Sequence, residues 1–394
     1  CMSRSACGVS RRGFMGALGG AAVLTGLSWK LLRAAEPGVA PAPGRQPLVV
    51  KPFFVYTTYR RRHQASWRSW GGIQTQDDVN QEVARINGEL KKLRAEADFP
   101  LEFLPLSSVR SDGEVAKAAD AAKADAMLIY AANGSSRCFD AIARLGKPVV
   151  FFLRWRSGPV YLWYEIISPR YLRRHSDELK VQGMDDQDVV VDALEDVTWR
   201  LRALCGLKNT VGARVVCVGG PAGWACRQAP ELARNRFMFD LRTVTYADLG
   251  KLIKAARADK AAVALARERA DAYLKQAGIT MEVKRPAVDN AFLLDQVFRG
   301  LLIQAKARMF TINGCMGTIM PMSETTACLP LSLLNDDGYL AFCESDFVVI
   351  PSGVLLAGIS GKPVFLNDPT YPCLLYTSDA ADELDGVDLG GRRI

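Results

Sequence analysis

Histidine is scarce in this chain, whose 394 residues include only two, His63 and His175. Both have charged or polar neighbours, so we expect surface positions for them, and a zinc site built from several histidines is not supported. The sequence also contains no C-x-x-C pair, although it has 10 cysteines. Most of these, such as Cys217 and Cys343, lie in apolar stretches. This predicts free thiols that pack as small hydrophobic groups rather than a disulfide framework.

Several sequence motifs of enzymes and binding domains are missing as well. No G-x-S-x-G segment is present, which argues against a Ser-His-Asp hydrolase. The glycines of residues 219–223 follow a strand-like run, but they lack the G-x-G-x-x-G spacing of dinucleotide-binding proteins. Such a turn either lets the backbone approach a ligand closely or is only a tight turn. The formal net charge is +8, but the basic runs are short and lack interleaved aromatics, which argues against nucleic-acid binding.

The amino-terminal segment has the layout of an export signal. Arg11 and Arg12 precede an apolar run of small residues from 16 to 27, as in twin-arginine signal peptides. This run is shorter than the roughly 20 residues that a membrane span needs. We therefore expect residues 1–34 to be a twin-arginine signal peptide that directs the protein through the twin-arginine translocase to the periplasm or another extracytoplasmic compartment. A retained amino-terminal anchor is the alternative, and residues 35–47 are expected to be a Pro/Ala-rich linker.

The body of the chain alternates between strand-like and helix-like segments. Residues 48–56 are rich in β-branched and aromatic side chains, which predicts a strand. Apolar residues recur at helical spacing over residues 75–97, and Thr75 with Asp78 fits a capping box at the start of that helix. Strands separated by helices of this length form βαβ units. The sequence therefore predicts an α/β fold with two Rossmann-like lobes, each built on a parallel sheet.

We place the first α/β domain at residues 48–210 and the second at residues 211–372. The first domain is expected to close with a helix over residues 185–205 that ends at Gly206. In the second domain we expect strands at residues 214–218, 308–313, 339–343 and 363–366. We also expect helices near residues 246–256, 260–278, 286–307, 323–334 and 347–359.

The last segment, residues 373–394, shows neither strand alternation nor a helical stripe long enough to pack. It is similar to translated adaptor read-through at the ends of metagenomic reading frames. We expect it to be a non-native tail, with a disordered natural tail as the alternative. On this interpretation the natural chain continues beyond Pro372 and a further domain is missing.

Two acidic residues follow successive predicted strands of the second domain. Glu344 comes after the strand at 339–343, and Asp368 after the strand at 363–366, with a helix between them. Parallel strands end at one edge of a sheet, so the two carboxylates are expected to converge there. Hard oxygen ligands suit a divalent metal such as Mn²⁺ or Mg²⁺, and the same pair suits proton transfer. The alternative is that such acids only cap helices.

The segment 343–346, the helix after it and the segment 360–368 together resemble the signature region of the L-fucose/L-arabinose isomerase family. The resemblance implies that Glu344 and Asp368 bind Mn²⁺ and are the catalytic residues of an aldose–ketose isomerase, an intramolecular oxidoreductase whose metal polarises the sugar carbonyl. It also implies a homo-oligomer and a carboxyl-terminal β-rich domain. That domain supplies a third metal ligand, a histidine, before which this chain ends.

Two functional hypotheses are open at this point. The first is a metal-dependent sugar isomerase, or a close relative, that acts outside the cytoplasm; without the third ligand, this fragment is expected to be inactive. The second is a non-catalytic, exported carbohydrate-binding protein on the same two-lobed scaffold. In that protein Trp67, Trp70 and Trp224 stack on sugar faces, unless they are only packing residues. The second hypothesis predicts sugar binding without metal and without turnover.

Overall fold

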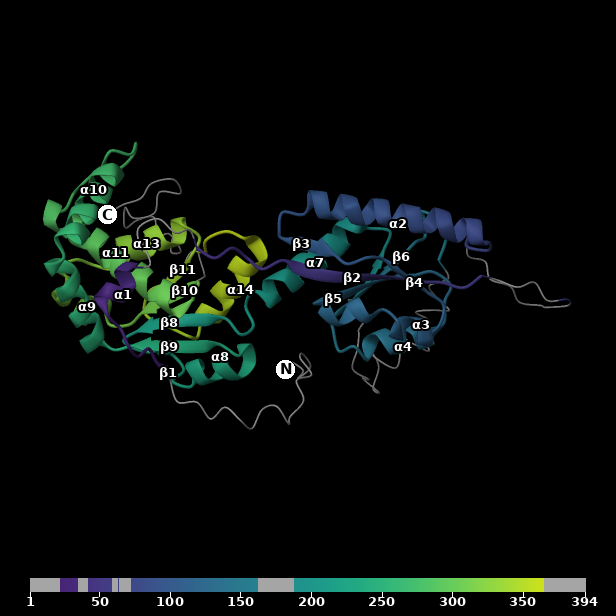
Figure 1. The fold of residues 1–394 in the computed structure, drawn as a ribbon, viewed down its shortest axis with the longest axis horizontal. Coiled ribbons are helices and arrows are strands. Elements are labelled where there is room, and N and C mark those ends of the chain that lie inside the picture. Colours follow the sequence, from purple (N-terminus) through teal and green to yellow (C-terminus); the bar gives the residue numbers. More distant parts are fainter. Residues whose placement is uncertain (1–21, 35–41, 59–62, 64–71, 162–187, 365–394) are drawn as a thin grey trace, which may run out of the picture. The chain divides into compact units, whose positions relative to one another are not determined.

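The protein consists of two compact units (Figure 1). One unit extends from Arg45 to Lys208, and the other combines residues 16–44 with the chain from Asn209 onward. The first unit is therefore an insertion in the sequence of the second one. The chain passes from the second unit into the first at Arg45 and returns to the second at Asn209. The computed structural model describes residues 22–34, 42–58, 63, 72–161 and 188–364.

The first unit is a parallel sheet with helices on both faces. Its strand order is β3-β2-β5-β6-β7, with β4 also paired to β2. Helices α2 and α7 pack on one face, and the short helices α3 and α4 pack on the other. The bounds are β2 (Leu48–Val55), α2 (Gln76–Glu96), β3 (Leu101–Phe103), β4 (Ser107–Val109), α3 (Asp112–Ala116), β5 (Ala126–Ala131), α4 (Ser136–Ala143), β6 (Val149–Leu153), β7 (Val189–Val191) and α7 (Leu194–Lys208).

In this unit the sequence predicted the start of helix α2 correctly and the start of helix α7 incorrectly. The predicted capping box is confirmed, because Thr75 Oγ1 accepts a hydrogen bond from Asp78 N at 3.2 Å and Asp78 Oδ2 accepts one from Thr75 N at 2.8 Å. The helix predicted over residues 185–205 is wrong in its first part, because β7 lies there. Three consecutive valines favour a strand at the sheet edge, so α7 begins only at Leu194. It also continues through Gly206, which is therefore not its cap.

The second unit has a five-stranded parallel sheet in the order β1-β9-β8-β10-β11. Helices α1, α9, α10, α11 and α13 cover one face, while α8 and α14 cover the other. The bounds are β1 (Ala22–Val23), α1 (Trp29–Ala34), β8 (Arg214–Val218), α8 (Ala229–Phe237), β9 (Asp240–Val244), α9 (Tyr246–Ala258), α10 (Lys260–Leu274), α11 (Arg285–Ala305), β10 (Met309–Ile312), α12 (Met320–Ser323), α13 (Cys328–Asp336), β11 (Leu340–Phe342) and α14 (Ile350–Ser360).

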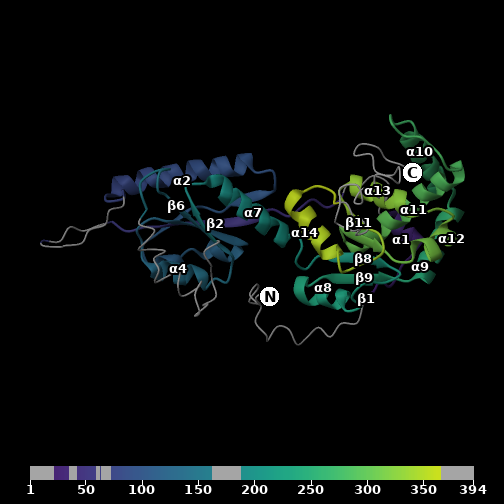
Figure 2. The ribbon, with the colours of Figure 1, turned by 180° about the vertical axis from the view of Figure 1, so that it is seen from behind.

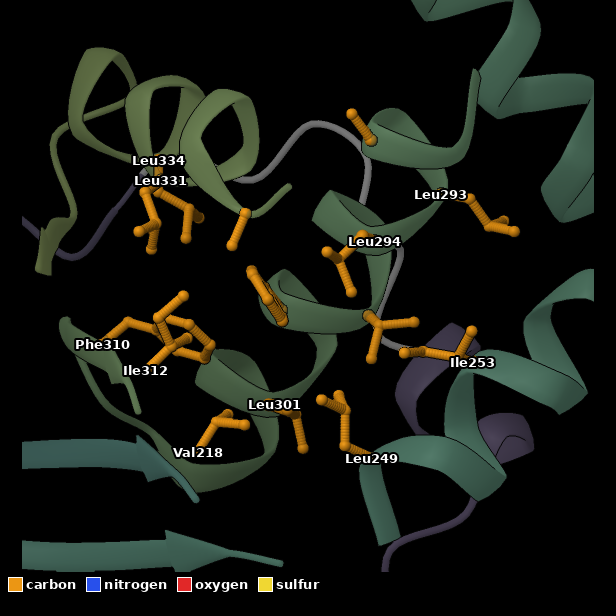
Figure 3. Packing of buried hydrophobic residues seen from close by; sticks show 14 of the residues in the cluster. Val218, Leu249, Ile253, Leu293, Leu294, Leu301, Phe310, Ile312, Leu331 and Leu334 are labelled. Atoms are coloured by element: carbon orange, nitrogen blue, oxygen red, sulfur yellow. The ribbon is translucent and has the colours of Figure 1, made fainter. Parts of the chain in front are cut away.

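Helix α11 is the centre of the larger core. Figure 3 shows its Leu294 and Leu301 among side chains from the sheet, such as Val218 and Phe310, and from α9 and α13. Nearly every position of α11 from Val288 onward is buried, which is the pattern of a helix enclosed by protein. With both sheets parallel and covered by helices, the predicted α/β class with two Rossmann-like lobes is confirmed.

The structure places an unexpected segment in the second unit. Residues 22–34, which the sequence assigned to a signal peptide, form β1 and α1; Figure 2 shows β1 beside β9 at the edge of the sheet. Export by the twin-arginine route stays a prediction, and its paired arginines lie outside the described residues. Asp368 and the tail at 373–394 also lie outside them. Within the described ranges, no helix is both long and apolar enough to cross a membrane.

Candidate functional site

Three loops meet at the carboxyl edge of the second sheet. They follow the adjacent parallel strands β8, β10 and β11, and they comprise residues 219–223, 313–315 and 343–346. Ligands of open α/β sheets bind outside this edge, because the connecting loops there are free to vary. We call these three loops the edge loops.

The glycine-rich edge loop is a tight turn rather than a phosphate cradle. Gly219 and Gly220 have φ of +77° and +89°, a region that glycine occupies without strain. The amides of Gly219, Gly220 and Ala222 already donate to the carbonyl oxygens of Val244, Cys217 and Ser345. An anion therefore finds these three donors occupied, which favours the tight-turn interpretation of the sequence.

Tyr246 explains why two of the edge loops need glycine. A Cβ on Gly219 or on Gly314 would overlap the Tyr246 phenol, so that ring occupies the space beside both backbones. The Tyr246 hydroxyl donates to the carbonyl oxygen of Asn313 at 2.9 Å. The ring thus fixes the loop after β8 against the loop after β10. Burial raises the pKa of Tyr246, so its hydroxyl remains a donor at neutral pH.

The first and third edge loops are joined by backbone pairing. Ala222 N donates to Ser345 O at 3.0 Å, and Phe347 N donates to Ala222 O at 2.9 Å. Trp224 N donates to Asp346 Oδ1 at 3.2 Å. The Trp224 side chain is nevertheless 64% exposed, so it is not a packing residue. The backbone of this exposed tryptophan is therefore tied to the third edge loop, residues 343–346, which we call the acidic loop. Trp67 and Trp70 lie outside the described residues.

The acidic loop has a strained backbone. Glu344 and Ser345 have φ of +67° and +49°, a left-handed conformation that non-glycine residues rarely adopt and that clusters at functional sites. Ser345 is fully buried, and its hydroxyl finds no hydrogen-bond partner among the residues that the structure describes. Asp346 Oδ1 accepts from Trp224 N and Val348 N, so the Asp346 side chain stabilises the turn after β11. Glu344 itself is only partly buried at the end of β11.

A pair of thiols lies beside Glu344. Cys315 and Cys343 are hydrogen-bonded through their side chains, and Cys343 Sγ lies 3.6 Å from Glu344 Oε1. The hydrogen bond from Cys343, helped by the Ala327 amide, lowers the pKa of Cys315 below the ordinary thiol range despite burial. The same bond, together with burial, raises the pKa of Cys343. Cys315 also opens a π-helical turn, Cys315–Ile319, a feature frequent at functional sites.

The sequence interpretation missed this pair, because each cysteine by itself looks like a packing residue. The signal that points to it is positional. Cys343 directly follows β11, and Cys315 lies three residues beyond the end of β10, the strand paired with it. Neighbouring parallel strands bring such positions to one edge.

The described part of the edge loops does not fit a Mn²⁺ or Mg²⁺ site. Among the described residues, no three His, Cys, Asp or Glu side chains come together in a way that could hold a metal ion. The groups near Glu344 are two soft thiols, whereas these hard cations prefer several oxygen ligands. The predicted partner of Glu344, Asp368, lies outside the described residues. Mn²⁺ binding by this pair therefore stays a prediction.

The carboxyl edge of the first sheet carries a different polar cluster. Arg154 follows β6 and is fully buried, with its Nε 2.6 Å from Glu82 Oε1 and its Nη2 2.8 Å from Glu89 Oε2. Tyr161 donates to Glu82, and the guanidinium lies over the rings of Tyr130 and Tyr161. Because two carboxylates already neutralise Arg154, this cluster has the character of an internal structural network rather than an anion site.

Comparisons with known proteins do not assign a family. No protein-family model and no curated protein matches the sequence. One solved structure that is similar is an ABC transporter periplasmic solute binding protein from Actinobacillus succinogenes 130z with bound D-allose. It has 10% sequence identity and a TM-score of 0.20, over 82% of this chain and 96% of that chain. A likeness at this TM-score carries no argument about function.

Proposed function

We propose that the chain is a non-catalytic carbohydrate-binding protein on an α/β scaffold of two lobes, and that it acts outside the cytoplasm. The sugar site that we propose is on the edge loops of the second unit. The observation that carries the proposal is the position of Trp224, an exposed indole whose backbone is hydrogen-bonded to the acidic loop that contains Glu344.

This arrangement suits a sugar for two physical reasons. A pyranose presents apolar C–H groups on its faces, and an indole offers a large, flat surface for stacking. Its hydroxyl groups need hydrogen-bond acceptors, and the side chain of Glu344 offers two oxygens that accept from hydroxyl groups. Trp224 and Glu344 are held in register by the bonds from Ala222 to Ser345 and from Trp224 to Asp346. These bonds join the loops after β8 and β11 across β10, the strand that lies between them.

The test is sugar binding in the presence of a metal chelator. Calorimetric titrations with a panel of pentoses, hexoses and 6-deoxyhexoses would be run on the full chain and on Trp224→Ala and Glu344→Gln. We expect one sugar class to bind in EDTA, and each substitution to weaken its binding by about 5- to 150-fold, since a lost stacking or charged contact is worth about 1–3 kcal/mol. Trp199→Ala is the matched control, because Trp199 is as exposed but belongs to α7 of the first unit.

A second candidate is a metal-dependent aldose–ketose isomerase. The observation that favours it is the position of Glu344 at the end of β11, which matches the family resemblance of the sequence. Its test is Mn²⁺-dependent interconversion of the same sugars, with Glu344→Gln and Asp368→Asn as variants. Turnover that both variants abolish would support the isomerase. Sugar binding in EDTA without turnover would support the binding protein, and neither binding nor turnover would reject both. Passage through the twin-arginine translocase and homo-oligomerisation stay predictions.

A further inference from the structure

We infer that residues 22–34 form a strap that completes the second unit and stays with the folded protein, rather than a leader that is removed. This inference is independent of the proposed sugar site. It rests on three features: an edge strand, a buried helix face and a glycine that makes room for that helix.

The strand β1 closes one edge of the sheet. Ala22 and Val23 pair in parallel with Arg242 and Thr243 of β9, and Leu24 N donates to Thr243 O at 2.9 Å. Without β1, the outer backbone groups of β9 would be unpaired at a sheet edge, where exposed strands invite pairing with other chains. The strap therefore satisfies backbone groups of the second unit.

The helix α1 contributes one face to the main core. Trp29 and Leu32 belong to the same buried cluster as residues of α9 and α11. Leu32 is fully buried, whereas its neighbour Leu31 is 61% exposed. The helix thus has a defined inner and outer side, as expected for an element of the fold.

A specific hydrogen bond fixes the orientation of α1. Trp29 Nε1 donates to Asp259 Oδ2 at 3.1 Å. The other oxygen of Asp259 accepts from the amides of Ala261 and Ala262 and so caps α10. One carboxylate therefore links the strap to the junction between α9 and α10.

Gly300 of α11 is complementary to Leu32. A Cβ on Gly300 would lie 2.8 Å from the Leu32 Cβ, closer than carbon atoms pack. Glycine is disfavoured in the interior of a helix, and here the close approach of Leu32 accounts for it. The surface of α11 is therefore shaped for the strap.

These contacts set a requirement on processing. A cut after Ala34 would leave a cavity in place of Leu32, expose the edge of β9 and remove the hydrogen bond from Trp29 to Asp259. The mature protein is therefore expected to retain residues 22–34, so that any amino-terminal cleavage occurs ahead of Ala22.

The structural part is tested by thermal unfolding of the full chain with Leu32→Ala and, as its matched control, Leu31→Ala. We expect Leu32→Ala to lower the Tm of the second unit by about 5–15 °C, as for a large-to-small change in a core, and Leu31→Ala to leave it nearly unchanged. Hydrogen exchange gives a second readout that does not depend on substitution. The Leu24 amide should exchange as slowly as amides within β9. Equal Tm values for both variants, or a Leu24 amide that exchanges freely, would overturn the inference.

The processing part is tested by mass spectrometry. The full chain would be produced in a bacterium with an active twin-arginine pathway and purified from whichever compartment contains it. We expect every folded form to contain residues 22–34. A folded form that starts after Ala34 and has the Tm of the full chain would contradict the strap.

Discussion

Arg154 Nε lies 2.6 Å from Glu82 Oε1, and both side chains are shielded from solvent. Removing one partner of such a pair leaves an uncompensated buried charge, which typically costs about 3–5 kcal/mol. We therefore expect Arg154→Met to lower the free energy of unfolding of the first unit by that amount in urea titrations. Arg156→Met is the control, because the Arg156 side chain is exposed. If both variants unfolded at the same urea concentration, the network would not be structural.

The contact between Gly219 and Tyr246 leads to a second prediction. Gly219→Ala adds a methyl group that overlaps the phenol ring, whereas Gly278→Ala adds one where no atom lies within 4 Å. Both glycines have positive φ, so both substitutions carry the backbone penalty of about 1 kcal/mol. The additional overlap at Gly219 is expected to cost about 1–3 kcal/mol more in denaturant unfolding. Equal losses would show that Tyr246 moves aside without cost.

The carboxylate of Asp192 predicts a particular sensitivity to acid. Although burial opposes it, hydrogen bonds from the Ser157 side chain and from the amides of Trp155, Ser157 and Arg156 lower the pKa of Asp192 to about 2. A carboxyl whose pKa is lower in the folded state stabilises that state above its unfolded pKa of roughly 4. This stabilisation is lost as the pH falls from about 4 to about 2.

The check is the pH dependence of unfolding for the wild type and Asp192→Ala. The variant should be less stable at pH 7, and the difference should shrink as the pH falls through that window. Asp140→Ala is the control, because Asp140 belongs to α4 and not to the segments 155–157 and 189–192 that form the Asp192 contacts. A difference from wild type that is constant between pH 7 and pH 2 would contradict the assignment.

The sequence predicted elements whose cause is local. The strand β2, the capping box at Thr75 and the helices α9 to α11 follow from periodicity and end signals within a few residues. Strand β9 was missed, because Asp240 and Arg242 interrupt its apolar pattern. The structure accounts for a charged residue within this strand, because the Asp240 carboxylate forms an ion pair with Arg214 of the neighbouring strand β8 at 2.6 Å.

The same limit applies to the edge loops and to the strap. Glu344 was placed correctly at the end of a strand, but its neighbour Cys315 is brought there only by the pairing of β10 with β11. The apolar residues of segment 22–34 suit a signal peptide as well as a buried core element. The contacts that distinguish these two roles are made with Gly300 and Asp259, which are far away in the sequence. Local sequence patterns carry no information about contacts between residues that are far apart in the sequence.

The Cys315–Cys343 pair gives the last prediction. Thiolates react with alkylating reagents and thiols do not, so the rate of modification follows the thiolate fraction. Because the Cys343 thiol lowers the pKa of Cys315, the alkylation rate of Cys315 should reach its plateau at a lower pH than the rate of an ordinary cysteine such as Cys226. Mass spectrometry of digests after timed labelling measures this rate residue by residue.

Cys343→Ala removes the thiol that hydrogen-bonds to Cys315, the largest cause of its low pKa. The midpoint for Cys315 should then move upward toward the ordinary range near 8.5. Cys226→Ala is the matched control, because Cys226 is also partly exposed in the second unit but lies outside the pair. A Cys315 midpoint that does not move in Cys343→Ala would mean that the Ala327 amide alone lowers it. A midpoint near 8.5 already in the wild type would mean that the two thiols do not share a hydrogen bond in solution.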